Sequence, residues 1–321
     1  SAANKNNIFK IGVIGFLAGL APDLDVLIQS STDPILFLEY HRQFTHSLFF
    51  IPFGSLIVAL VLFPLVKSSM SIKTVYFASL LGYATHGLLD ACTSYGTQLL
   101  WPFSNERVTW NNISIVDPLF TIPALIRLVI AVKTKKKIFS FISIGWITFY
   151  LSLGFIQYER ALLVAVELAH MRGHNPERLT LKPSFGNLIL WKSIYQHEQN
   201  FYVDAIRTVQ SSSVCLGESI KIFNYQQHLP GLDKESQQAE DVERFRWFSQ
   251  DYLGFDDEKN LVTDVRYSML PNQIEPMWGL VIDDQRDINE HAIWWTGRDL
   301  DQSQLSLFKE MLSGKKCRNR S

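Results

Sequence analysis

Apolar segments constrain this chain most, because they fill its first half almost without interruption. They cover residues 8–28, 47–66, 74–91, 114–132 and 138–156. Each approaches the roughly 20 apolar residues that a helix needs to cross the hydrocarbon core of a bilayer. The sequence therefore predicts an α-helical membrane bundle of about five spans. The helical core of a large soluble protein is the alternative, since it produces similar apolar segments.

Charged residues are distributed unevenly between the two halves of the chain. Of the 30 basic and 31 acidic residues, only about 18 lie within residues 1–156. We therefore predict a transmembrane helical domain at 1–156 and a soluble α+β domain at 157–321. Stretches typical of strands lie at 188–195, 200–208, 261–268, 278–283 and 292–296, and stretches typical of helices lie at 235–252 and 303–312. The second domain is slightly acidic, which argues against a nucleic-acid partner.

Basic residues in the loops predict how the first domain is oriented. Lys67 and Lys73 flank the loop between the second and third apolar segments, and four lysines lie at 133–137 between the fourth and fifth. Such loops remain on the cytoplasmic side. With five alternating spans, the chain is expected to be a multi-pass membrane protein with an extracytoplasmic soluble domain.

Short polar clusters interrupt the apolar segments near their ends. These clusters are Pro22-Asp23-Leu24-Asp25, His41-Arg42-Gln43-Phe44-Thr45-His46, His86-Gly87-Leu88-Leu89-Asp90 and Val116-Asp117-Pro118. Carboxylates and imidazoles are costly near a bilayer, so they indicate a functional site by default. The expected topology places every cluster on the side opposite the basic loops. We therefore predict that they form one metal site.

The spacing within two clusters favours chelation of a metal. His86 and Asp90 are four residues apart, so they share one face of a helix. Imidazole and carboxylate together suit a divalent metal, zinc or manganese, at a site that retains a water. His41 and His46 are five residues apart and need a turn between them to converge. A buried His–Asp hydrogen bond that stabilises the helices is the alternative for the first pair.

The remaining carboxylates have a second possible role in ending or starting helices. Asp23 and Asp25 flank one residue after Pro22, where they could chelate cations or hydrogen-bond a neighbouring backbone amide in a turn. Asp117 precedes Pro118 at the start of a predicted helix, a position that suits both a metal ligand and a helix cap. These alternatives stay open at the level of sequence.

The three cysteines indicate little about the fold. Cys92, Cys215 and Cys317 are widely separated and form no Cys-x-x-Cys pair. Their spacing predicts no disulfide framework. Cys92 is expected to pack as a small apolar residue.

In order and spacing, the polar motifs resemble those of the YdjM-like bacterial membrane-bound metal-dependent hydrolases, a family of helical inner-membrane proteins. The matching motifs are Gly19-Leu20-Ala21-Pro22-Asp23-Leu24-Asp25, His41-Arg42-x-x-Thr45-His46-Ser47, His86-x-x-x-Asp90, Thr93-x-x-Gly96 and Pro102-Phe103. The resemblance covers roughly residues 8–155 and implies a place in the bacterial inner membrane. Gln43 departs from the glycine that is usual after His-Arg. The metal ligands implied by the resemblance are Asp25, His41, His46, His86 and Asp90.

The resemblance implies metal-dependent hydrolysis, and the expected topology places the site at the extracytoplasmic interface of the membrane. A divalent metal lowers the pKa of a bound water, for which Asp23 is the expected general base. Arg42 is expected to stabilise the developing anion, and Asp117 to bind the metal or to orient a histidine ligand. Membrane lipid is the expected partner, and a lipid or lipid-linked ester or phosphodiester the expected substrate. A transporter and a noncatalytic membrane anchor that presents the soluble domain are the alternative functions.

Overall fold

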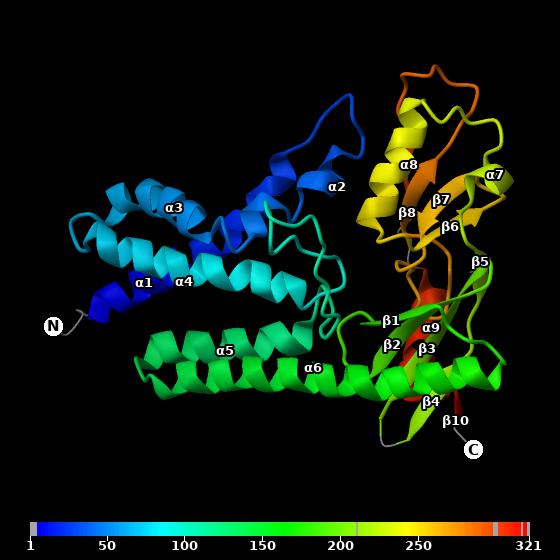
Figure 1. Cartoon of the computed structure of the whole chain (residues 1–321). Helices are drawn as coiled ribbons and strands as arrows, with labels where there is room; N and C mark the ends of the chain where they lie inside the picture. Colours follow the sequence, from blue (N-terminus) through cyan, green and yellow to red (C-terminus); the bar gives the residue numbers. More distant parts are fainter. Residues whose placement is uncertain (1–4, 210, 298–300, 316, 320–321) are drawn as a thin grey trace. The chain divides into compact units, whose positions relative to one another are not determined.

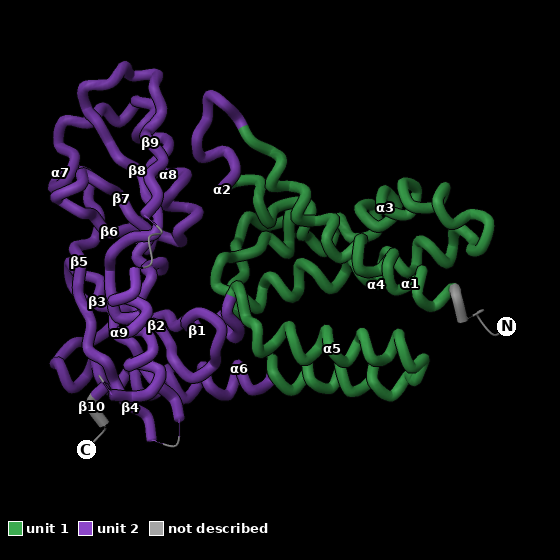
Figure 2. The backbone as a smooth tube through the Cα atoms, turned by 180° about the vertical axis from the view of Figure 1, so that it is seen from behind, with its two compact units in different colours: residues 1–29, 39–110, 115–151 green, residues 30–38, 111–114, 152–321 purple. Residues whose placement is uncertain are grey.

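The chain divides into two compact units. The computed structural model describes residues 5–209, 211–297, 301–315 and 317–319 (Figure 1). Unit 1 contains the described residues up to 29 together with 39–110 and 115–151, and unit 2 contains 30–38, 111–114 and the described residues from 152 onward (Figure 2). Two short segments of the first half therefore belong to the unit that the second half forms.

Unit 1 is helical. Its elements, including two that continue into unit 2, are α1 (Lys5–Leu20), the 3-10 helix η1 (Ala21–Leu27), α2 (Leu36–Tyr40), the 3-10 helix η2 (Phe44–His46), α3 (Ile51–Val66), α4 (Ile72–Ala91), α5 (Pro118–Thr134) and α6 (Ile138–Met171). Helix α4 packs against both α1 and α3. Ile14, Ala59 and Val75 form part of the buried core between these helices. This packing brings the ends of η1, η2 and α4 together.

The predicted bundle of about five spans is wrong. Helices α1, α3 and α5 contain 16, 16 and 17 residues. At 1.5 Å per residue they extend roughly 24–26 Å, less than the hydrocarbon core of about 30 Å. Among the described helices, only α6 is long and apolar enough to cross a membrane, and a second span results only if Leu36–His46 and Ile51–Val66, bent by 86°, count as one. The multi-pass topology expected from five spans is therefore not supported.

Proline residues explain part of this error. The segment at 8–28 contains Pro22, and the α-helix gives way there to the 3-10 helix η1. The segment at 114–132 becomes helical only at Pro118, which lacks the amide hydrogen that an interior helical position needs. Helix α4 has 20 residues, but threonine, tyrosine, histidine and aspartate make it too polar for a span. Hydropathy thus overestimated both the length and the apolar character of the helices.

Unit 2 is rich in antiparallel strands. One sheet has the order β1-β2-β3-β4-β10 with β5 paired to β3, and a second has the order β6-β7-β8-β9. The strands are β1 (Arg178–Pro183), β2 (Leu190–His197), β3 (Asn200–Thr208), β4 (Ser212–Cys215), β5 (Ser219–Lys221), β6 (Leu253–Asp256), β7 (Leu261–Asp264), β8 (Trp278–Val281), β9 (Ile293–Thr296) and β10 (Arg318–Asn319). The helices are α7 (Tyr225–His228), α8 (Gln237–Phe248) and α9 (Gln302–Ser313).

A disulfide joins Cys215 at the end of β4 to Cys317 just before β10. The expectation of no disulfide is therefore wrong. The two cysteines are 102 residues apart in sequence. Sequence spacing could not reveal the pair, because only the pairing of β4 with β10 brings the two residues together. Cys92, in contrast, is a buried free cysteine, as expected.

The core of unit 2 contains an unusual buried lysine. Lys192 on β2 lies directly opposite Lys182 on β1 in the strand register. Its Nζ donates to Ser268 Oγ at 2.6 Å and to the Gln273 carbonyl at 2.9 Å. Burial lowers the pKa of Lys192 to about 7, since the charged form is the one that loses hydration.

We expect the free energy of unfolding to rise as the pH increases from about 7 toward 10.5, the ordinary pKa of a lysine. In that interval the unfolded chain binds a proton that folded Lys192 lacks, so deprotonation favours the folded state. Lys192→Met should remove this part of the pH dependence. Denaturant titrations of the wild type and of the variant, in detergent at several pH values, measure the free energy of unfolding. If this free energy changed with pH equally in the two proteins, the result would contradict a Lys192 that is neutral in the folded state.

Candidate metal centre

The first part of the site comes from η1, directly after α1. Pro22 lies at the start of this 3-10 helix, and Asp23 and Asp25 follow. Asp25 is buried, whereas the side chain of Asp23 is 49 % exposed. The proline therefore changes the helix type just where the chain presents two carboxylates on a short turn.

The second part contains the turn that the spacing of His41 and His46 required. Arg42 has a φ of 64°, in the left-handed region that residues other than glycine rarely adopt. Its amide donates to Asp25 Oδ2 at 2.9 Å, which holds this backbone in place. The chain then enters η2, where His46 is buried. The predicted turn is confirmed, and a carboxylate from η1 stabilises it.

The third part is the end of α4. His86 and Asp90 lie one helical turn apart, as their spacing predicts. Gly87 between them faces the backbone of His46, and a Cβ atom at this position would overlap the His46 carbonyl oxygen. The absence of a side chain at Gly87 thus allows η2 to approach α4 closely.

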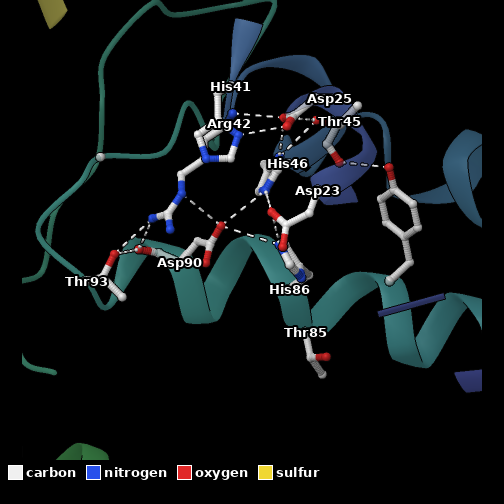
Figure 3. Close-up of polar contacts among 12 residues, drawn as sticks. Asp23, Asp25, His41, Arg42, Thr45, His46, Thr85, His86, Asp90 and Thr93 are labelled. Atoms are coloured by element: carbon white, nitrogen blue, oxygen red, sulfur yellow. Dashed lines mark hydrogen bonds and ion pairs between the residues drawn. The ribbon is translucent and has the colours of Figure 1, made fainter. Parts of the chain in front are cut away.

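One candidate ligand group combines all three parts. Its members, Asp23, His46, His86 and Asp90, each offer a ligand atom within 4.8 Å of the others (Figure 3). His46 Nε2 lies 3.1 Å from Asp90 Oδ2, and His86 Nε2 lies 3.2 Å from Asp23 Oδ1. Two imidazole nitrogens and two carboxylate oxygens are a donor set that zinc and manganese accept.

A second candidate group contains Asp23, Asp25 and His41 and so shares Asp23 with the first. His41 Nδ1 lies 2.7 Å from Asp25 Oδ1. His46 Nδ1 lies 3.2 Å from Asp25 Oδ2, on the side of the ring away from the first group. A carboxylate on the second ring nitrogen is the arrangement that orients metal-binding histidines. Asp25 therefore suits a role in orienting His46 as well as a role as ligand.

Two atoms of the first group make no well-aligned hydrogen bond with any described residue, although they lie 3.1 Å apart. They are His46 Nε2 and Asp90 Oδ2, both fully buried. A buried polar atom without a well-aligned hydrogen bond is costly, and a bound cation would contact both atoms. The residues present therefore fit a divalent metal.

The charges in the group stabilise one another. Close contacts with the imidazole rings of His46 and His86 hold the pKa of the Asp23 carboxyl well below its usual range. Burial disfavours the charged form of His86, but the nearby carboxylates of Asp23 and Asp90 outweigh this effect and raise the pKa of His86 to about 9. A cation bound here would replace the proton on this ring.

Arg42 contacts the group from one side. Its Nε lies 3.2 Å from Asp90 Oδ2, and its Nη1 donates to Thr93 Oγ1 at 2.9 Å. The guanidinium also lies over the ring of Tyr95, 4.9 Å from its centroid. Stabilisation of an anion by Arg42 stays a prediction, while these contacts hold the side chain against Asp90.

Asp117 is not part of either candidate group. Its Oδ1 accepts a hydrogen bond from the Phe120 amide at 3.1 Å, which caps α5. The Tyr150 hydroxyl donates to both carboxylate oxygens, at 3.0 and 2.9 Å. Of the two interpretations that the sequence left open, the structure supports the helix cap.

Two further residues support the site without having been singled out from sequence. Thr45 Oγ1 donates to Asp25 Oδ2 at 2.8 Å and lies 2.9 Å from His46 Nδ1. The Tyr83 hydroxyl donates to the Thr45 carbonyl at 2.9 Å. Thr45 stands within the His41–His46 motif, but no sequence signal identifies Tyr83, because its contact depends on how α4 packs.

We expect Gly87→Ala to destabilise the fold by about 1–3 kcal/mol, the usual cost of overpacking a close contact. The new methyl group would displace His46 and weaken the first ligand group. Gly12→Ala is the matched control, because, apart from the backbone of its own helix, no atom of the described residues lies within 4 Å of its Cβ position. Thermal unfolding in detergent measures the loss of stability, and the metal content measures the weakening of the ligand group. Equal stability and equal metal content in the two variants would contradict the prediction.

Comparisons with known proteins agree with the motifs. Residues 2–161 match the model of the family described as YdjM inner membrane protein. The "Uncharacterized protein YfhP" of Bacillus subtilis (strain 168) is 31% identical over 119 residues, which cover 37% of this chain and 36% of that protein. The chain thus matches little more than a third of this curated relative's length, and no solved structure is significantly similar. Through residues 2–161, the chain belongs to the YdjM inner membrane protein family.

Proposed function

We propose that unit 1 is a membrane-associated metal-dependent hydrolase. His46, His86 and Asp90 would hold one divalent cation, zinc or manganese, with Asp23 beside them. The observation that carries this proposal is the convergence of four potential ligand atoms, among which the buried His46 Nε2 and Asp90 Oδ2 make no well-aligned hydrogen bond with any described residue. Three protein ligands and an open position are typical of catalytic zinc sites.

Each residue has a role in this mechanism that follows from its position. The bound cation would supply a water of lowered pKa and polarise the scissile bond. Asp23 is the exposed carboxylate of the group, so it can reach the attacking water and take its proton. Asp25 and Arg42 would orient the ligands, because Asp25 contacts His46 Nδ1 and Arg42 contacts Asp90. Arg42 would also stabilise negative charge that develops on the substrate.

The surface beside these carboxylates favours a lipid or lipid-linked ester or phosphodiester as substrate. Leu24 and Leu27 on η1 are 63% and 75% exposed, although they flank the acidic residues. Exposed apolar side chains of this kind mark contact with a membrane or with an apolar ligand. A substrate with an apolar chain could thus lie on these leucines while its polar group reaches Asp23.

The disulfide supports a location of unit 2 outside the cytoplasm. Cys215 and Cys317 are joined in this unit. Disulfides persist in oxidising compartments and are rare in the cytoplasm. The proposed location of the protein is therefore the inner membrane, with unit 2 on the extracytoplasmic side.

Two other functions are less well supported. A transporter site is usually built between several spans near the middle of the bilayer, whereas the described helices provide one candidate span, or two. A noncatalytic anchor would use the His–Asp contacts only for stability. The anchor hypothesis differs from the hydrolase in predicting that the wild-type protein retains no metal.

We expect the detergent-purified protein to retain about one equivalent of zinc or manganese, or two if the second group is also filled. His46→Ala and His86→Ala should lose the metal of the first group, because each removes one of its imidazole ligands. Elemental analysis measures the content, with circular dichroism as the check on folding.

Asp117→Asn provides the matched control. Asp117 is a buried, hydrogen-bonded carboxylate, but it belongs to neither candidate group. Its variant should keep the metal even if α5 is destabilised. A wild-type protein without metal after reconstitution with zinc and manganese would contradict the proposal and favour the anchor.

A further inference from the structure

A short segment between two candidate ligands belongs to unit 2. Asp25 and His41 both lie in unit 1, but residues 30–38, which connect them, are part of unit 2. The base of this loop is closed in unit 1, because Asp25 contacts His41 Nδ1 at 2.7 Å and the Arg42 amide at 2.9 Å. The chain therefore leaves the candidate metal centre, enters unit 2 and returns.

An ion pair holds this segment within unit 2. Arg244 on α8 donates to both oxygens of Asp33, with Nη2–Oδ2 at 2.7 Å and Nη1–Oδ1 at 3.2 Å. Both side chains are largely buried. Two parallel hydrogen bonds between a guanidinium and a carboxylate fix distance and orientation at once.

The arginine is itself held by buried groups. Its Nη1 lies 3.0 Å from Oδ1 of Asp241, whose side chain is fully buried. Asp241 also accepts a hydrogen bond from the Ala292 amide at 2.9 Å and lies 2.9 Å from His291 Nδ1. Arg244 thus has little freedom to follow the segment if the segment moves.

Aromatic packing fixes the segment at a second point. The ring of Phe37 meets that of Trp294 on β9 edge to face, with centroids 5.3 Å apart. Trp294 in turn packs edge to face on Phe245 of α8, at 5.9 Å. Between the two fixed points, Ile35 is 1% exposed. Residues 33–37 are therefore held by a charged contact and by an apolar one.

We propose that unit 2 positions the metal centre by holding this segment, with Asp33 and Arg244 as the positioning residues. This inference rests on the proposed function. Fixing the middle of the loop limits the conformations of its ends, and these ends carry Asp25 and His41. Asp25 in turn lies against His46. Loss of such an outer contact typically weakens metal binding about 10–100-fold.

A double-mutant cycle on the full chain in detergent tests this role. Asp33→Asn and Arg244→Gln should each weaken Co²⁺ binding about tenfold and alter the visible spectrum of the bound cobalt. The double variant should resemble either single variant, because the two residues act through one contact. Arg244→Lys keeps the charge and should restore part of the affinity.

Arg246→Gln is the matched control. Arg246 lies on the same helix and pairs with Glu243 and Asp251, both in unit 2. Its loss should leave cobalt affinity and spectrum unchanged. Hydrogen exchange of residues 25–46 in the apo proteins provides a readout that does not depend on metal, and it should accelerate in the Asp33 and Arg244 variants alone.

The outcomes separate the two proposals. A wild-type protein that binds no metal would contradict the proposed function, and hydrogen exchange would then decide whether unit 2 orders the residues around Asp25 and His41. A wild-type protein that binds metal, with Asp33 and Arg244 variants of equal affinity and spectrum, would overturn the positioning role. Faster exchange limited to residues 30–38 would overturn it as well.

Discussion

The buried carboxylate of Asp25 is the group on which the candidate metal centre depends. A charged side chain without hydration needs several hydrogen-bond donors. Asp25 obtains them from the Arg42 amide and Thr45 Oγ1, with His41 Nδ1 at hydrogen-bond distance. Because these groups lie on η2 or on the turn that leads into it, the carboxylate joins η1 to this segment. The positions of both histidines follow from this connection.

Helix α4 completes the arrangement through close backbone contacts. Gly87 lies against the His46 carbonyl, and a Cβ atom at Gly82 would overlap the carbonyl oxygen of Gly15 on α1. Small residues at these two positions let α4 pack tightly beside α1 and η2. His86 and Asp90 thereby reach residues that precede them by more than forty positions.

The two units have different surfaces and different stabilising contacts. Many large apolar side chains of unit 1 are exposed, such as Phe16 on α1, Leu65 on α3 and Leu81 on α4, which agrees with membership of an inner membrane protein family. Unit 2 is stabilised in addition by a disulfide and by buried ion pairs, such as that of Arg266 with Asp264. The ion pair between Arg244 and Asp33 extends this pattern to a segment from the first half of the chain.

Local features of the fold and of the candidate site could be read from the sequence. The spacing of His86 and Asp90 placed both on one helical face, and the spacing of His41 and His46 required the turn at Arg42. Alternating residues at 200–208 indicated the strand that the structure contains. In each case the predictive pattern involves residues a few positions apart, so the sequence contains it, even though Asp25 stabilises the turn at Arg42 from 17 positions away.

Only the tertiary structure decided the rest. Hydropathy suggested about five spans because it sums side-chain character over a window, while helix ends depend on residues such as Pro22 and on packing. Asp117 could be a ligand or a cap until the contact with Tyr150 was known. The disulfide joins two cysteines that are 102 residues apart in sequence. The ion pair between Asp33 and Arg244, which holds residues 30–38 in unit 2, likewise joins positions more than a hundred residues apart. The sequence by itself determined which chemical groups are present and their local geometry, and long-range packing determined which of them meet.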